Sequence, residues 1–487
     1  MRLSNATLDA LPDAIDRPRY DRAALSPGIV HIGVGNFHRA HQAWYLHRLM
    51  QEGAALDWAI VGAGVRPGDA AMRDRLMAQD GLTTLIELDP SGRSAEVVGP
   101  MIDYAPVEPD NAALIARMAD PAARIVSLTV TEGGYFGAAA GDLDVDHPDI
   151  AHDAANPGAP RTAFGAMVAA LARRRAAGTG AFTGLCCDNI QANGAALRRA
   201  VVVMARLSDP DLAAWIDGEA RFPNAMVDCI VPATEADTLA LVREMGIADD
   251  APVTHENYRQ WVLEDDFAQG RPDWDRVGAT FSGVVHDYEA MKIRMLNGGH
   301  QVLANPGEIL GLETIADCMA HDRIAAFFRK VETDEIAPHV RPVPDMAPTA
   351  YVDLIARRFA NPAIRDTVRR VAFDGSSRHP GFVLPVLRDA LAADAPVEGL
   401  ALVEALWARM CEGMREDGSA IAPNDPHWDD LAAAARAARD DPAAWLAQRR
   451  FYGDLAQSPR FAGAFARWLG VLWRDGTDAA LRAYVSA

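Results

Sequence analysis

Several features that define other classes of protein are missing from this chain of 487 residues. Cysteine is scarce and odd in number, with five residues, and no pair has Cys-x-x-Cys spacing. The adjacent Cys186 and Cys187 cannot readily hold one zinc ion, so neither a disulfide framework nor a cysteine-based zinc site is expected. No run of 18 uncharged apolar residues could span a membrane, and no apolar stretch near Met1 resembles a signal peptide. We therefore expect reduced thiols and a cytoplasmic protein.

Positively charged residues are fewer than negatively charged ones. The chain has 47 Lys and Arg residues against 67 Asp and Glu residues, a formal net charge of −20. Such a surface repels nucleic-acid backbones and anionic lipid heads, so neither is an expected partner. Half of the residues are hydrophobic, which is ordinary for a globular protein. The length favours two or three domains.

In the first half of the chain, short apolar runs alternate with stretches of helical periodicity. The helical stretches include residues 163–177 and 193–207, and residues 225–232 indicate a further strand or strand end. This alternation predicts an α/β fold of Rossmann type, with a mainly parallel sheet covered on both faces. The four expected main strands occupy residues 29–32, 58–61, 125–130 and 182–187.

The second half reads as helix after helix, without strand candidates. We place the boundary near Gly283, which predicts a dinucleotide-binding domain over residues 1–283 and an all-α substrate and catalytic domain over residues 284–487. The expected helices occupy residues 288–303, 315–331, 350–359, 383–392, 400–414 and 442–455.

A glycine turn follows the first main strand. Gly33-Val34-Gly35 precedes Asn36-Phe37 at the start of a helical stretch, which is half of a dinucleotide-binding fingerprint. The third glycine is missing, because His38 stands there, and a plain structural turn is the alternative. Asp69 is the nearest candidate for the acid that binds ribose hydroxyls and favours NAD over NADP; a solvated loop residue is the alternative.

The densest chemical signal is Lys292, Asn297 and His300 within one helical stretch. On an α-helix Asn297 lies about 140° from Lys292, with His300 between them, so one broad face carries all three. Burial tunes lysine into a base, amides polarise oxygens and imidazole orients protons. An amphipathic helix with a snorkelling lysine is the alternative. Gly298 and Gly299 cost about 1 kcal/mol each in mid-helix, which a closely approaching ligand would explain.

Other polar residues follow strand ends or interrupt helices. Asn189, after Asp188, is a candidate to polarise a substrate oxygen, with an Asx turn as the alternative. His38 and His41 lack further ligands with metal-site spacing, so no metal is expected. The remaining candidates, each with a structural alternative, are Glu132 as a gate on proton or water exchange, Asp228 for substrate hydroxyls, and Arg370, Arg378 and His379 for hydroxyls or a carboxylate.

These motifs together resemble the polyol-specific long-chain dehydrogenase family, typified by mannitol 2-dehydrogenase. The matching segments run in order along the chain: residues 33–42, 131–135, 187–189, 224–228 and 260–265, the Lys292-x-x-x-x-Asn297-x-x-His300 pattern, and residues 374–377. The resemblance implies a Rossmann-type domain plus an all-α domain, with catalysis in the cleft between them. It implies zinc-independent hydride transfer between a polyol and a nicotinamide cofactor, with NADP less favoured than NAD, and it favours a monomer.

The resemblance also implies roles for individual residues. Lys292 is similar to the general acid/base, Asn189 and Asn297 to the pair that binds the reacting oxygen, and His300 to a residue that orients substrate hydroxyls. By the same resemblance, Asp69 is similar to the NAD-selecting acid, Glu132 to a gate on proton or water exchange, and Asp228 and Arg370 to substrate-binding positions. The glycine turn itself puts Gly33, Val34, Gly35, Asn36 and Phe37 on the cofactor side, and Arg378 and His379 remain candidates for the substrate side.

Two departures from the family bear on specificity. The usual Val-Asp-Arg segment reads Val227-Asp228-Cys229, and the position before the NAD-selecting acid, often acidic, is Gly68. D-mannitol and D-fructose are the leading substrate pair; sorbitol, D-arabitol and a fructuronate-type hexuronate stay open. A nonenzymatic NAD-binding protein and a Schiff-base enzyme using Lys292 are the rivals from other classes.

Overall fold

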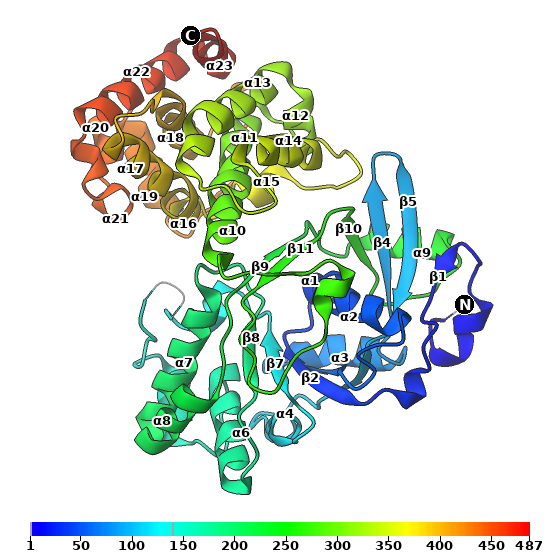
Figure 1. The fold of residues 1–487 in the computed structure, drawn as a ribbon. Helices are drawn as coiled ribbons and strands as arrows, with labels where there is room; N and C mark the ends of the chain where they lie inside the picture. The colour runs from blue at the N-terminus through cyan, green and yellow to red at the C-terminus, as the bar shows by residue number, and fades with distance from the viewer. Residues whose placement is uncertain (1, 139–140) are drawn as a thin grey trace. The chain divides into compact units, whose positions relative to one another are not determined.

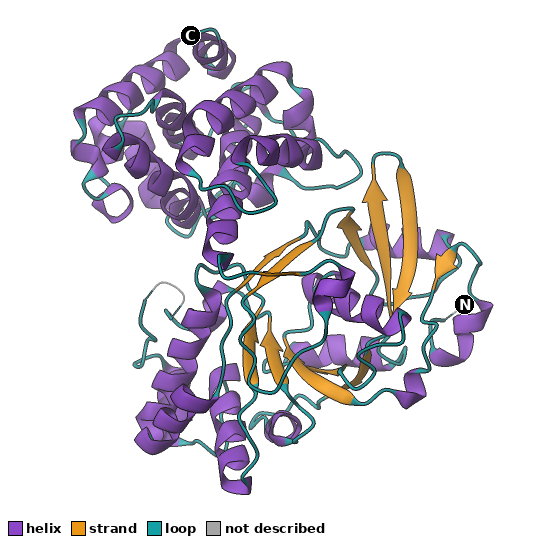
Figure 2. Cartoon of the chain, in the orientation of Figure 1, coloured by secondary structure: helices purple, strands orange, loops and turns teal. Residues whose placement is uncertain are grey.

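The computed structural model describes residues 2–138 and 141–487, and the chain divides into two compact units. Unit 1 ends at His286 and unit 2 spans Asp287–Ala487, against a predicted boundary after residue 283. Strands occur in unit 1, whereas unit 2, which is described throughout, contains only helices and loops (Figure 2). Among the described residues, no helix is both long and apolar enough to cross a bilayer.

The centre of unit 1 is a five-stranded sheet in which every neighbouring pair is parallel (Figure 1). The strand order is β6-β3-β2-β7-β8. Parallel strands buried on both faces read as continuous apolar runs, and this confirms the predicted Rossmann-type sheet. The strands are β2 (Pro27–Ile32), β3 (Ala59–Ala63), β6 (Met101–Tyr104), β7 (Ile125–Leu128) and β8 (Thr183–Cys186).

Each face of this sheet has its own hydrophobic core. Val30 and Ile32 of β2 join one core with side chains of α4, α6, α7 and α8, while Ile29 joins the other with side chains of α2 and α3. Alternate residues of a strand point to opposite faces, so one short strand supplies both cores. The helices of unit 1 are α1 (Asn36–Ala40), α2 (Gln42–Gln51), α3 (Asp69–Met77), α4 (Ala112–Ala119), α5 (Pro148–Ala155), α6 (Ala163–Ala177), α7 (Asn193–Ser208), α8 (Pro210–Glu219) and α9 (Ala236–Glu244).

Two smaller sheets complete unit 1. The first, in the order β1-β5-β4-β10, is built on an antiparallel hairpin of β4 and β5; the second has the order β12-β11-β9. The strand expected within residues 225–232 is β9. The bounds are β1 (Ile15–Asp16), β4 (Thr83–Asp89), β5 (Gly92–Val98), β9 (Ala225–Asp228), β10 (Val253–Glu256), β11 (Gln260–Leu263) and β12 (Thr280–Phe281), with 3-10 helices η1 (Asn5–Ala10), η2 (Arg22–Ala24), η3 (Glu132–Tyr135) and η4 (Trp274–Val277).

Unit 2 is organised around two buried helices. Every residue of α18 (Glu398–Cys411) from Gly399 to Cys411 is buried, and α18 packs on α11 (Gly298–Leu310) and α22 (Pro459–Asp475). The helix predicted over residues 288–303 is α10 (Val285–Met291), the π-helix η5 (Lys292–Asn297) and the start of α11 in unbroken succession.

The other helices of unit 2 cover this pair (Figure 1). They are α12 (Ile315–Ala320), α13 (Asp322–Val331), η6 (Glu332–Ile336), η7 (Ala337–His339), α14 (Pro348–Phe359), α15 (Val368–Val371), α16 (Gly375–Arg378), η8 (His379–Val383), α17 (Leu384–Ala392), α19 (Trp428–Ala437), α20 (Ala443–Leu446), α21 (Arg449–Tyr452), η9 (Leu455–Gln457) and α23 (Thr477–Val485).

Candidate active site

The glycine turn lies where the strand order of the sheet reverses. From β2 the chain builds outward through β3 and β6, then returns to add β7 and β8 on the other side. Gly33 has φ +90°, and a Cβ there would lie 2.2 Å from the Thr129 carbonyl oxygen, so only glycine fits between the ends of β2 and β7. Such a switch point is where open α/β sheets bind ligands.

The second glycine of the turn differs from the first. A Cβ on Gly35 would meet only the Gly33 carbonyl oxygen, at 3.9 Å, so open space lies beside its backbone. The neighbouring side chains are engaged in the fold: Val34 packs in the core, the Asn36 amide donates to the Pro232 oxygen at 3.0 Å, and Phe37 stacks on His41. The backbone around Gly35 is therefore the part of the turn that a ligand can approach.

A carboxylate stands just beyond the next strand. Asp69 accepts a hydrogen bond from the Arg66 backbone amide at 2.9 Å and closes the loop that follows β3. A Cβ on Gly64 would lie 2.3 Å from the Asp69 Cβ, so this glycine lets the acid fold back over the strand end. Asp69 is half-buried, and its place at the end of the second main strand suits an acid that binds ribose hydroxyls.

The ends of β7 and β8 are joined by Asp188, whose role in the fold the sequence did not indicate. Its carboxylate accepts from the amides of Val130 and Thr131, at 3.0 and 2.8 Å, and from the Tyr135 hydroxyl at 2.9 Å. The neighbouring Asn189 is exposed. Glu132 begins η3 in the loop that Asp188 holds, and its side chain lies outside the described part of the structure.

Three other polar residues singled out in unit 1 are buried. His38 is 1% exposed and stacks on His31 with ring centroids 3.4 Å apart, and burial lowers the pKa of His38 well below its usual value. The His41 Nε2 lies 2.9 Å from the Gln260 oxygen. Asp228, at the end of β9, is 3% exposed and pairs with Gln260 across the β9–β11 ladder.

In unit 2, Lys292 and Asn297 are the first and last residues of the π-helix η5. Hydrogen bonds in a π-helix run from i to i+5, so these two residues lie closer in angle than the 140° expected on an α-helix. Their exposures are 8% and 9%. The Asn297 Nδ2 is buried and has no hydrogen-bond partner among the described residues. An unsatisfied donor beside a buried lysine is the arrangement that a bound oxygen would complete.

His300 follows one turn later, against Asp366 and Phe359. Its Nε2 lies 3.6 Å from an Asp366 oxygen, and its ring lies 4.3 Å from that of Phe359. Burial, and then the positive charges of Arg370, Arg378, Arg358 and Lys292, hold the pKa of His300 well below its usual value. The imidazole is therefore uncharged at neutral pH.

The two predicted arginines and His379 have different surroundings. Arg370 bonds Asp366 at 2.7 Å and remains 58% exposed at its side chain, and Arg378 donates to the Val371 oxygen at 2.5 Å. His379 is 0% exposed, with Nδ1 2.7 Å from Glu404 and Nε2 3.1 Å from Asn305. Both of its nitrogens are used within the core, so neither is left to bind a substrate hydroxyl or carboxylate.

The expectation that a ligand explains the two mid-helix glycines is wrong for Gly299. A Cβ at Gly299 would lie 2.7 Å from the Glu332 Oε1 and 2.8 Å from the Phe328 ring, so the protein itself fills the space. A Cβ at Gly298 would meet the Phe382 carbonyl oxygen at 3.6 Å, an ordinary contact.

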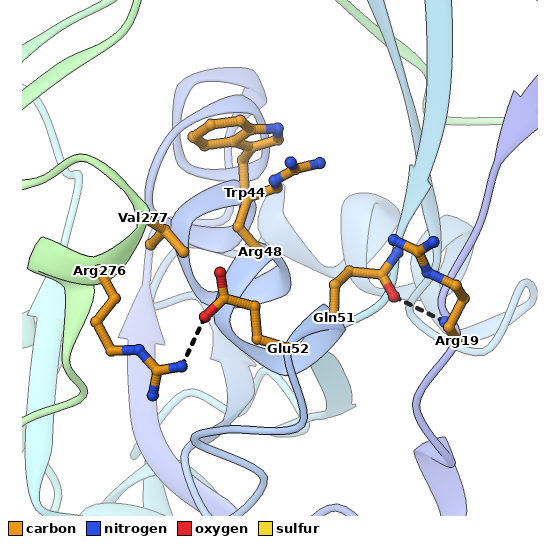
Figure 3. Close-up of a pocket in the computed structure, with 7 residues that line it drawn as sticks. All are labelled: Arg19, Trp44, Arg48, Gln51, Glu52, Arg276 and Val277. Atoms are coloured by element: carbon orange, nitrogen blue, oxygen red, sulfur yellow. Dashed lines mark hydrogen bonds and ion pairs between the residues drawn. The ribbon is translucent and has the colours of Figure 1, made fainter.

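Unit 1 also has a surface pocket of about 270 Å³, to which no predicted site residue contributes. Figure 3 shows Trp44 and Arg48 of α2 on its wall and the ion pair between Arg276 and Glu52, at 2.8 Å. The residues predicted to bind the cofactor and to react with the alcohol lie elsewhere, at the strand ends of unit 1 and on η5 and α11.

Unit 1 is thus a dinucleotide-binding fold of Rossmann type, with a glycine turn at its switch point and an acid after its second main strand. Residues 27–276 match the family described as Mannitol dehydrogenase Rossmann domain, and residues 284–473 match the Mannitol dehydrogenase C-terminal domain. The chain therefore belongs to the mannitol dehydrogenase family.

Individual relatives cover nearly the whole chain. The mannitol 2-dehydrogenase of Cereibacter sphaeroides is 54% identical over 474 residues, 97% of this chain and 99% of the relative. That of Aspergillus terreus is 40% identical over 97% of this chain and 96% of the relative. Family membership is therefore not confined to one of the two units.

Two solved structures share the fold over the full length. The Pseudomonas fluorescens mannitol 2-dehydrogenase, in a ternary complex with NAD and D-mannitol, has a TM-score of 0.90 and 39% identity, with 100% of both chains covered. A D-sorbitol dehydrogenase in substrate-free form has a TM-score of 0.90 and 34% identity, covering 99% of this chain and 100% of the other.

Proposed function

We propose that this protein is an NAD-dependent polyol dehydrogenase that oxidises D-mannitol to D-fructose, with Lys292 as the general base. The observation that carries the proposal is the π-helix η5, which places a buried lysine and the unsatisfied Asn297 amide one π-turn apart. Family membership and the relatives named above support the polyol as substrate class.

Lysine is the residue that this chemistry requires at position 292. The chain has two lysines, Lys292 and Lys330, and its other basic residues among the 47 Lys and Arg are arginines. A guanidinium does not give up its proton in proteins, whereas an amine can. A sequence that uses arginine almost everywhere therefore keeps an amine at a buried position where a base is needed.

In the proposed oxidation, separate residues remove the proton, stabilise the oxygen and bind the other hydroxyls. The Lys292 amine accepts the hydroxyl proton of the reacting carbon, and the amides of Asn189 and Asn297 donate to the same oxygen as negative charge develops there. The uncharged His300 orients a neighbouring hydroxyl. Asp228, Arg370 and Arg378 bind further hydroxyls.

NAD fits the residues of unit 1. The open space beside Gly35 admits a pyrophosphate, and the Asp69 carboxylate binds ribose hydroxyls and repels a 2′-phosphate. When bound, NAD supplies the acceptor for the hydride that leaves the alcohol carbon as its oxygen loses the proton. We further propose that Glu132 gates the exchange of that proton with water.

Lys292→Ala tests the role of the base. We expect kcat/KM for D-mannitol to fall by about 10²–10⁴-fold near neutral pH, the usual contribution of a general base. Lys330→Ala is the matched control, since Lys330 is the other lysine, lies 3.1 Å from Asp334 and should change little. Near-full turnover of Lys292→Ala across the pH range would refute the proposal.

Two further assays address the rivals. A substrate panel of mannitol, sorbitol, D-arabitol and mannonate, with NAD and NADP compared, identifies the substrate by the largest kcat/KM. The sorbitol arm matters because a D-sorbitol dehydrogenase shares the fold. NAD binding without polyol-dependent reduction would favour a nonenzymatic protein, and a substrate adduct trapped by borohydride would favour Schiff-base chemistry.

A further inference from the structure

A buried acid lies beside the helix that carries Asn297 and His300. Glu332 is 0% exposed, and neither carboxyl oxygen has a hydrogen-bond partner among the described residues. An ionised carboxylate without partners is costly to bury, and burial alone raises the pKa of Glu332 well above its usual value. Burial therefore favours the uncharged form of this carboxyl group.

The Glu332 carboxyl group fills the space that a side chain at Gly299 would occupy. Its Oε1 lies 2.7 Å from the position of a Cβ on Gly299, the residue between Gly298 and His300. Phe328 and Phe359 border the same position, at 2.8 and 3.5 Å, and the Phe359 ring lies against His300. Glu332, the two phenylalanines and the His300 ring thus form one packed support for the segment 297–300.

Among the described residues, no charged partner is paired with the Glu332 carboxyl group. The charges on neighbouring elements have other partners: Arg294 bonds Asp389, Arg329 bonds Asp353 and Lys330 bonds Asp334. None of the described side chains donates a hydrogen bond to Glu332. The remaining ionisable groups on the elements packed against it are Lys292 on η5, His300 and Glu308 on α11, Asp322 and Arg323 on α13, Glu335 on η6, His339 on η7, and Tyr351, Arg357 and Arg358 on α14.

We propose that Glu332 is a positioning residue of the polyol site, which fills the space beside Gly299 and supports the helix segment that carries Asn297 and His300. This inference rests on the proposed function of those two residues. An apolar side chain would give the same support at every pH. Ionisation of an acid removes this packing support. Substrate binding should therefore weaken as pH rises.

The sign of the pH effect follows from linkage. An acid whose folded pKa is raised stabilises the fold most below its ordinary pKa of about 4.3, and this contribution is lost as pH rises toward the raised value. Across that window the unfolding equilibrium shifts against the folded state by about tenfold per pH unit. Glu332→Gln has nearly the same shape and cannot ionise, so it should escape this loss.

The first experiment compares Glu332→Gln with the unaltered protein. At neutral pH we expect kcat and KM for D-mannitol within about twofold. As pH rises from 4 to 9, the Tm of the unaltered protein should fall relative to that of the variant, and the alkaline rise in KM should be weaker in the variant. Parallel Tm curves or an unchanged alkaline limb of KM would overturn the proposal.

Glu335→Gln is the matched control on the same element. Glu335 is also buried, but it accepts from the amides of Gly399 and Leu400, at 2.6 and 2.9 Å, and from the Tyr484 hydroxyl at 2.8 Å. Burial raises the pKa of Glu335 too, but these three hydrogen bonds lower it in part. The same substitution replaces an acceptor of all three bonds with an amide, so it should lower Tm throughout the pH range. A Tm for Glu335→Gln that rises above that of the unaltered protein as much as at Glu332 would show a general effect of lost charge and would overturn the inference.

A double-mutant cycle tests contact through Gly299. Gly299→Ala should lower Tm and raise KM, because its Cβ overlaps Glu332, and Gly299→Ala combined with Glu332→Ala should recover part of both. Additive losses would overturn the positioning role. Because Tm against pH needs no substrate, it separates this inference from the base assignment: a fully active Lys292→Ala would refute the proposed function and leave the Tm difference at Glu332 in place.

Discussion

The two glycines of the turn should respond in opposite ways to the same substitution. In Gly33→Ala the new Cβ would lie 2.2 Å from the Thr129 carbonyl oxygen, and the residue would keep φ +90°. In Gly35→Ala the nearest atom is 3.9 Å away and the backbone has φ −96°, which alanine adopts freely. One change therefore strains the fold, and the other only fills open space.

The magnitudes follow from these contacts. For Gly33→Ala, a left-handed backbone costs about 1–2 kcal/mol and overpacking a further 1–3 kcal/mol, so we expect a loss of about 3 kcal/mol in unfolding free energy. For a unit that spans Met1–His286 this lowers Tm by about 5 °C. Gly35→Ala should keep Tm or raise it slightly, because alanine restricts the unfolded chain by about 0.4–1 kcal/mol.

Cofactor affinity provides the second measurement. If the pyrophosphate of NAD approaches the backbone at Gly35, the added methyl group should weaken binding at least tenfold, or about 1.4 kcal/mol, in calorimetric titration of the folded variant. Scanning calorimetry without NAD checks the fold. A Gly35→Ala protein with unchanged NAD affinity, or a Gly33→Ala protein with unchanged Tm, would refute the reasoning about this turn.

Two further substitutions in unit 1 test the cofactor side and the loop. Asp69→Ser should lower the ratio of kcat/KM with NAD to that with NADP by about tenfold, because the carboxylate that repels a 2′-phosphate is gone; an unchanged ratio would place selectivity elsewhere. Asp188→Ala should cost about 3 kcal/mol in urea unfolding, because it removes the acceptor for the amides of Val130 and Thr131 and the Tyr135 hydroxyl. A loss under 1 kcal/mol would show that water replaces the carboxylate.

The fold class followed from patterns that local physics enforces. Strands such as Ile125–Leu128 are buried on both faces, so they read as apolar runs, and the helices between them keep their periodicity. The β4–β5 hairpin escaped prediction because its apolar pairs, Leu85-Ile86 and Val97-Val98, are short and have polar and charged residues on the side toward the exposed turn. Its pairing depends on partners that are distant in the sequence.

The site was foreseen in its residue types and less well in its geometry. Lys292, Asn297 and His300 stood out because polar groups are rare in such a stretch, but the π-turn that relates Lys292 to Asn297 has no sequence signature. The contact between Gly299 and Glu332, and the two core partners of His379, are tertiary contacts between residues up to 74 positions apart. Periodicity within a single helix cannot reveal them.

The π-turn has a consequence for register. A π-turn amounts to one extra residue inserted into an α-helix, so deleting a residue within 293–296 would let the helix close with ordinary i→i+4 bonds. Everything before the deletion would then swing by about 100° relative to everything after it. The shortened protein would then be more stable but inactive. The extra residue of this stretch therefore matters to function as much as the side chains that it carries.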